Sequence, residues 1–156
     1  MKTIWMIACV AVVTGCSSGS SKSSSDGNDG LDGSWVYTNS ANTAGLGALF
    51  NTDGTYALTE LVLTSSTAAN AQEETGTFTV SGDTITETPT KSTCDGPAPV
   101  HQLTYSISNG DLTLKDPSAV VVLQPNTSTS SNVAIVLGCF DSNGNFKAQP
   151  LASVSN

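Results

Sequence analysis

The chain has 156 residues, of which 38% are hydrophobic and 12% charged, and its formal net charge is −8 at pH 7. Average globular chains contain about 25% charged residues, and this one has no arginine at all. It therefore lacks the basic surface that binds nucleic acid or anionic lipid head groups, and we expect no nucleic-acid partner.

The first fifteen residues have the order of a secretory signal. Lys2 supplies a positive charge, 4–13 is an apolar run, and Gly15 is small. The run is about ten residues long, whereas a membrane-spanning helix needs about twenty. We therefore predict a cleaved signal peptide over 1–15, with an uncut anchor helix as the alternative.

The tetrapeptide that ends this run resembles the lipobox of bacterial lipoproteins. Val13, Thr14 and Gly15 precede Cys16, in the family's order of branched apolar residue, small residue, Gly and obligatory Cys. The resemblance implies that Cys16 becomes the first mature residue and carries a diacylglycerol thioether and an N-acyl chain such as palmitate, which together hold firmly to a membrane. Ser17, rather than Asp, implies export to the outer membrane. The alternative is an ordinary signal with a coincidental cysteine.

The remaining cysteines form a pair. Cys9 leaves with the signal peptide and Cys16 takes the lipid, so Cys94 and Cys139 remain in an oxidising compartment. We predict a disulfide between them, which closes a loop of about 45 residues worth about 4 kcal/mol in the chain-entropy model. Two free buried thiols are the alternative. We predict no metal site, because two cysteines and one histidine lack close ligand spacing.

The domain at 31–156 follows a tether at 16–30, whose Ser, Gly, Asp and Asn residues predict a flexible coil. From Leu31 onward, short apolar runs are separated by turn signals. We predict strands at Gly33–Tyr37, Leu46–Phe50, Thr55–Leu63, Glu74–Val80, Thr84–Thr88, Val100–Ser108, around Leu112 and Leu114, and at Ala119–Leu123, Val133–Phe140 and Phe146–Ala148.

Turn chemistry connects these strands. Asp53-Gly54 suits a type I′ hairpin turn, and Asn109-Gly110 is the strongest hairpin signal in the chain. In the strand predicted at Thr55–Leu63, the apolar residues change from one alternating face to the other part-way along. A bulge near Thr59-Glu60 would bring them all to the same face of the sheet. Ser65–Gln72 is predicted to be a loop, as is the region from Pro89 to Pro99.

Together, eight to ten strands with hairpin-like connections predict an all-β fold. We expect an antiparallel up-and-down meander that closes into a small barrel, because closure removes exposed sheet edges. A β-sandwich is the alternative. An eight-stranded barrel has room for its own side chains or for one small ligand.

The opening of the domain, Gly33-Ser34-Trp35, resembles the Gly-x-Trp signature of lipocalins. Asp53-Gly54-Thr55-Tyr56 and the stretch from Gly76 to Ile85 are similar to segments of bacterial lipocalin-like lipoproteins, and the resemblance covers most of 31–148. It implies a barrel whose closed end is plugged by Trp35. Five aromatic residues on the predicted inward faces are candidates for lining an apolar ligand pocket, with core packing as the alternative: Trp35, Tyr37, Tyr56, Phe78 and Tyr105.

Catalytic chemistry is not predicted. His101 is the only histidine, and the domain has no Gly-x-Ser-x-Gly elbow, so we expect a loop or strand-edge histidine rather than a catalytic triad. We interpret the acidic residues near strand ends, Glu73, Glu74 and Glu87, as solvated surface. Asp141, Asn143 and Asn145 have calcium-like spacing, but Phe146 stands where Gly is required, so a β-turn is predicted.

These observations predict a non-enzymatic, lipid-anchored lipoprotein of the cell envelope, on the outer membrane, whose barrel binds a small hydrophobic ligand. The alternative is a structural or protein-interaction module displayed at the same place. An interior cavity would favour binding, and a filled core would favour display. No cofactor is predicted, and the membrane is reached through Cys16.

Overall fold

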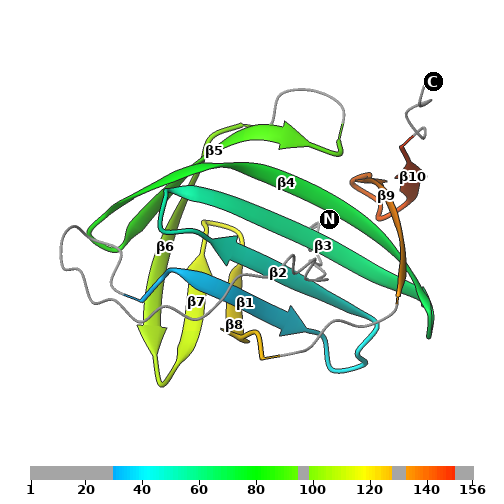
Figure 1. Cartoon of the computed structure of the whole chain (residues 1–156), viewed down its shortest axis with the longest axis horizontal. Helices are drawn as coiled ribbons and strands as arrows, with labels where there is room; N and C mark the ends of the chain where they lie inside the picture. Colours follow the sequence, from blue (N-terminus) through cyan, green and yellow to red (C-terminus); the bar gives the residue numbers. More distant parts are fainter. Residues whose placement is uncertain (1–29, 95–98, 128–132, 150–156) are drawn as a thin grey trace.

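The computed structural model describes residues 30–94, 99–127 and 133–149, which form ten strands (Figure 1). Each of β1–β8 pairs antiparallel with its neighbour in sequence, and β8 pairs with β1 to close an eight-stranded barrel. The strands are β1 (Gly33–Thr38), β2 (Ala44–Phe50), β3 (Thr55–Ser65), β4 (Ala68–Ser81), β5 (Thr84–Ser92), β6 (His101–Ser108), β7 (Asp111–Lys115), β8 (Val120–Pro125), β9 (Ala134–Phe140) and β10 (Phe146–Ala148).

This architecture confirms the predicted all-β, up-and-down meander. Closure is made where Trp35 stands opposite Pro125 and Val36 opposite Gln124, which gives a barrel rather than a sandwich. Closed eight-stranded barrels of this topology are the architecture of lipocalins. The fold is therefore lipocalin-like.

One half of the barrel is filled by a core. Trp35 is 6% exposed, and its indole N–H donates a 2.8 Å hydrogen bond to the carbonyl of Leu31. This anchors the segment before β1 against the barrel and satisfies the polar group of a buried aromatic ring. The other large core residues come from β2–β5, β7 and β8: Leu46, Phe50, Tyr56, Phe78, Ile85, Leu112, Leu114 and Leu123.

The third strand keeps one phase through the position where a bulge was predicted. Thr59 pairs with Glu73 and Glu60 with Gln72 without interruption, and the register shifts only between Leu63 and Ser65. The predicted bulge at Thr59-Glu60 is therefore wrong. Regular alternation continues from the inward Tyr56 and Leu58 to Glu60, so a carboxyl group faces the barrel interior.

The predicted loop over Ser65–Gln72 is also wrong, because β4 already begins at Ala68. Ala69 and Ala71 are 1% and 0% exposed. The small side chains of these two alanines fit at buried positions on β4, which is flanked by β3 on one side and by β9 on the other. β9 runs parallel to β4, with Ala68–Ala71 opposite Ala134–Leu137. This parallel pairing was not predicted.

The predicted loop from Pro89 is replaced by a longer β5. Pro89 stands opposite Gly76, next to a register shift between Thr75 and Gly76, and bulges are where a sheet tolerates proline. Position 76 also requires glycine, because neighbouring atoms approach its backbone closely. A Cβ added there would lie 2.7 Å from Cε1 of Tyr56 and 2.3 Å from the carbonyl oxygen of Thr88.

Both predicted hairpin turns are present, with different geometries. Asn109 and Gly110 have φ of 56° and 89°, the two positive values that a type I′ turn needs. In the other hairpin only Gly54 has a positive φ, and its N–H donates to the carbonyl of Asn51. That loop is a turn closed by a left-handed glycine, so the predicted type I′ geometry is wrong there.

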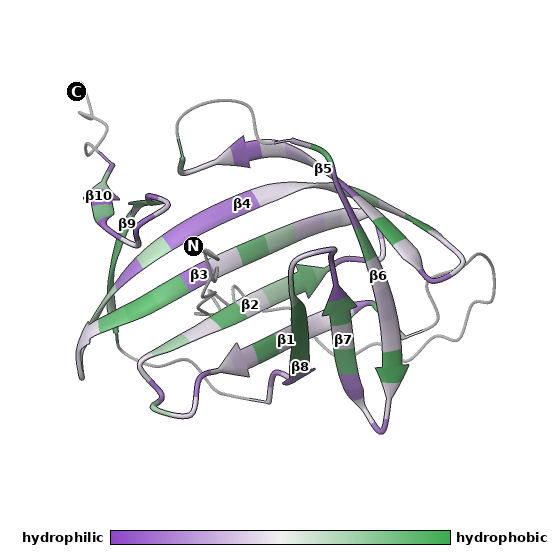
Figure 2. Cartoon of the chain, turned by 180° about the vertical axis from the view of Figure 1, so that it is seen from behind, coloured by the Kyte–Doolittle hydropathy of each residue, from purple (hydrophilic) through white to green (hydrophobic). Residues whose placement is uncertain are grey.

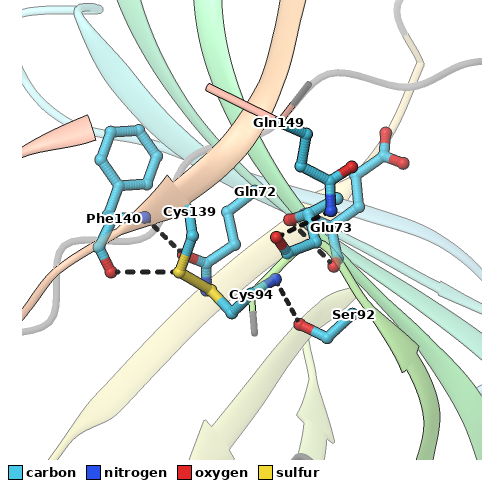
Figure 3. Close-up of a disulfide and its surroundings, with 8 residues drawn as sticks. Gln72, Glu73, Ser92, Cys94, Cys139, Phe140 and Gln149 are labelled. Carbon is cyan, nitrogen blue, oxygen red and sulfur yellow. Dashed lines mark hydrogen bonds between the residues drawn. A yellow bond between two sulfur atoms is a disulfide. The ribbon is translucent and has the colours of Figure 1, made fainter. Parts of the chain in front are cut away.

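The predicted disulfide between Cys94 and Cys139 is confirmed (Figure 3). It joins the chain just after β5 to the end of β9, at the point where β4 exchanges its neighbour β5 for β9. The Thr93 N–H donates a hydrogen bond to the Glu73 carbonyl, and the Glu73 N–H donates one to the Thr93 hydroxyl. The side-chain amide of Gln149 donates to the Thr93 carbonyl. The β9–β10 hairpin is therefore fastened to the barrel at this edge.

Candidate ligand cavity

A cavity of about 230 Å³ occupies the half of the barrel away from Trp35. Its walls come from the starts of β2, β6 and β8, the middles of β3, β4 and β5, and the end of β7. The lining residues are Leu46, Leu58, Glu60, Gln72, Glu74, Glu87, His101, Leu103, Leu114, Asp116, Ala119 and Val121. The cavity therefore combines aliphatic walls with an unusual number of carboxyl groups.

Glutamate is concentrated at this cavity. The chain has four glutamates, and all of them except Glu73 line the cavity. Strand alternation explains the difference, because Glu73 and Glu74 are consecutive on β4 and must face opposite sides of the sheet. The prediction that Glu74 and Glu87 belong to a solvated surface is therefore wrong. Figure 2 shows a hydrophilic stretch in the first half of β4, the strand that carries both Glu73 and Glu74.

Glu87 is the most buried of these acids. It is 2% exposed, and its Oε1 has no hydrogen-bond partner. It stands opposite Phe78 of β4 on one side and opposite His101 of β6 on the other. Burial, and to a lesser extent the neighbouring Glu74 carboxylate, raise the pKa of Glu87 to about 7.

Glu74 is held by Tyr56. The Tyr56 hydroxyl donates a 2.8 Å hydrogen bond to Oε1 of Glu74. Burial, this hydrogen bond and the nearby carboxylates together raise the pKa of Tyr56 far above its ordinary value, so the phenol stays protonated and remains a donor. The bond fixes one carboxyl of the cavity in place and supplies part of the compensation that a buried charge needs.

Glu60 and Gln72 face each other across β3 and β4. Burial raises the pKa of Glu60 to about 7. Gln72 connects the cavity to the β9–β10 hairpin, because its Oε1 accepts a 3.0 Å hydrogen bond from the N–H of Phe140 (Figure 3). The end of β9, which carries the disulfide, is thus bonded directly to a residue of the cavity wall.

His101 and Asp116 lie at the exposed rim of the cavity. A hydrogen bond from the Ser118 hydroxyl is the main reason that the pKa of Asp116 is lowered, and the charge of His101 contributes least. The Ser118 hydroxyl donates to Asp116 at 2.7 Å, whereas a nucleophilic triad requires histidine to stand between serine and acid. His101 is the first residue of β6, which confirms its predicted strand-edge position.

The five aromatic residues predicted to line a ligand pocket lie elsewhere. Trp35, Tyr56 and Phe78 are buried in the core, Tyr105 packs against it, and Tyr37 is 38% exposed at the end of β1. None of them lines the cavity described above, and the core-packing alternative describes four of the five.

Other predicted residues have simpler outcomes. Asp141 accepts hydrogen bonds from Asn143 and Asn145 across a tight turn, which confirms the predicted β-turn. Cys16, the signal peptide at 1–15 and the tether up to residue 29 lie outside the described residues.

Within 30–94, 99–127 and 133–149, no three His, Cys, Asp or Glu side chains are grouped so that they could hold a metal ion. The same part of the chain has no helix long and apolar enough to cross a membrane. Comparisons of the chain with protein families, with curated proteins and with solved structures found no match.

Proposed function

We propose that this chain is a lipid-anchored lipoprotein of the cell envelope whose barrel binds a small molecule with an apolar body. The observation that carries the binding part is the cavity of about 230 Å³ with aliphatic walls, which lies beside a packed core in the same barrel. Pockets for small molecules are concave and mostly apolar, with a few placed polar groups. Display alone would need no such cavity.

The location part rests on the N-terminal sequence. The lipobox resemblance at Cys16 and the short apolar run before it support export and lipidation. The Cys94–Cys139 disulfide supports an oxidising compartment, since such bonds persist there and are rare in the cytosol. We propose the outer membrane, because Ser17 follows the lipid site.

We also propose that the protein is not an enzyme. The one histidine of the chain shares its rim with Asp116, but Ser118 bonds to the acid rather than lying beyond the histidine. The cavity is better suited to holding a molecule than to activating a nucleophile.

The anchor is tested by replacing Cys16 with Ser and following processing and membrane fractionation. We expect an unprocessed chain that leaves the membrane fraction as lipidation is lost, whereas Cys9→Ser in the signal peptide leaves both steps unchanged. If the Cys16→Ser protein is still processed and still membrane-bound, the anchor proposal is wrong.

Binding is tested by native mass spectrometry of the protein purified from its host membrane. We expect a co-purified small molecule that is released when the barrel is unfolded. Repeated preparations that contain only the lipidated polypeptide, at every collision energy, would contradict the binding proposal.

A further inference from the structure

We infer that the cavity takes a small organic cation, a protonated amine on an apolar body, with Glu87 and Glu74 as its anionic anchors. The inference rests on the proposed binding function and adds the chemical class of the ligand. Three observations carry it: a buried carboxyl oxygen without a hydrogen-bond partner, a lining that contains no lysine, and aliphatic walls around the carboxyl groups.

The first observation is the unsatisfied acceptor of Glu87. Buried polar atoms are nearly always hydrogen-bonded in folded proteins, and those that are not call for an explanation. Oε1 of Glu87 is buried in the cavity wall and has no partner. A ligand that carries N–H donors would supply the missing bond, and an ammonium donor forms the stronger, charge-assisted kind.

The second observation is the sign of the charge. Glu60, Glu74, Glu87 and Asp116 line the cavity, and no lysine is among its lining residues. The only lining residue that can become cationic is His101, which is exposed at the rim. Glu74 and Glu87 repel each other across the interior. A cation placed near both carboxylates would turn this repulsion into two attractions.

The third observation separates an amine from a bare metal ion. Hard metal ions prefer a shell of oxygen ligands, whereas leucine and valine side chains cover much of this lining: Leu46, Leu58, Leu103, Leu114 and Val121. Such walls complement a hydrocarbon body. The volume of about 230 Å³ is below the 300–1,000 Å³ that is common for drug-sized ligands, so the ligand must be small.

The test compares three probes of one length, hexylammonium, hexanol and hexanoate, by isothermal titration calorimetry at pH 8. The whole lipidated chain is used in a non-ionic detergent, with detergent-only blanks. We expect hexylammonium to bind at least about tenfold more tightly than hexanol, as one charge-assisted hydrogen bond predicts, and hexanoate to bind most weakly.

Matched variants assign the effect to the cavity. Glu87→Gln should remove the preference for hexylammonium over hexanol, and Glu74→Gln should reduce it. Glu73→Gln removes the same charge from the opposite face of β4 and should leave the preference intact. Glu74→Gln keeps the assignment testable if Glu87→Gln fails to fold.

The remaining outcomes overturn the inference in distinguishable ways. Equal affinity for hexanol and hexylammonium would overturn the cationic ligand but leave the proposed binding function standing. No binding of any of the three probes, with no heat at either of two well-separated temperatures, would count against both and would indicate a cavity that holds only water. Displacement of hexylammonium by Ca²⁺ or Zn²⁺ at lower concentration, lost in Glu87→Gln, would show a metal site instead.

Discussion

Replacing Glu87 with Gln should change how the stability of the protein depends on pH. Burial raises the pKa of Glu87 from an ordinary 4.5 to about 7, so between these values the folded chain holds a proton that the unfolded chain has lost. Stability must then fall as pH rises from 4.5 to 7 and stay level above it. A rise of this size corresponds to about 3 kcal/mol.

The glutamine side chain is neutral throughout, so Glu87→Gln should lose this part of the slope. At pH 8 the variant should be more stable than the parent by up to about 3 kcal/mol, with little difference near pH 4. A constant offset from the buried amide would not alter the slope. The assay is urea unfolding followed by far-ultraviolet circular dichroism at half-unit intervals from pH 4 to pH 8.

Glu73→Gln is the control for the loss of one negative charge, because Glu73 neighbours Glu74 on β4 but faces the other side of the sheet. This variant should keep the slope of the parent. If Glu87→Gln keeps the same slope as the parent and as Glu73→Gln, then Glu87 does not titrate from a buried position, and the reasoning about the cavity fails.

Three further outcomes are expected. Replacing Cys94 and Cys139 together by Ser should lower stability by about 4 kcal/mol, since the bridge spans 45 residues; urea unfolding measures this, and a loss below about 1 kcal/mol would contradict it. Gly76→Ala should cost about 1–3 kcal/mol by overpacking against Tyr56, and a thermal midpoint equal to that of the parent would count against the close contact. The affinity for hexylammonium should fall as pH drops below about 7, where the anchor Glu87 becomes protonated; calorimetry that finds the same affinity at pH 5.5 and pH 8 would show that Glu87 does not hold the ammonium group.

The barrel could be predicted because its turn signals and alternation are local. Asn109-Gly110 and Asp53-Gly54 mark hairpins whose flanking strands alternate between apolar and polar residues. A meander needs only such neighbouring contacts. The parallel pairing of β9 with β4 joins segments that are far apart in the chain, and no local signal reports it.

The cavity was missed because charged residues were interpreted as solvent-facing. Extending the inward phase of Phe78 back along β4 passes Gly76 and arrives at Glu74, and extending the phase of Ile85 by two arrives at Glu87. The alternation therefore contained the signal. The usual distribution of residue types argues against an inward-facing glutamate, because glutamate is almost never fully buried without a partner.

Glu60 was missed for a related reason. A bulge was predicted to move Leu61 and Leu63 into the barrel, but Leu61 instead belongs to a second apolar cluster with Ala69. That cluster depends on the alanines at the start of β4, which belong to a stretch of small and polar residues that predicted a loop. Tertiary packing on both sides of β4 outweighs that local signal.

The most direct measurement of the central claim is a carbon-13 nuclear magnetic resonance titration of the Glu87 carboxyl group, with and without saturating hexylammonium. We expect a pKa of about 7 in the protein alone, and a lower value when the ammonium group is bound beside the carboxylate. A pKa near 4.5 that is the same in both samples would contradict it.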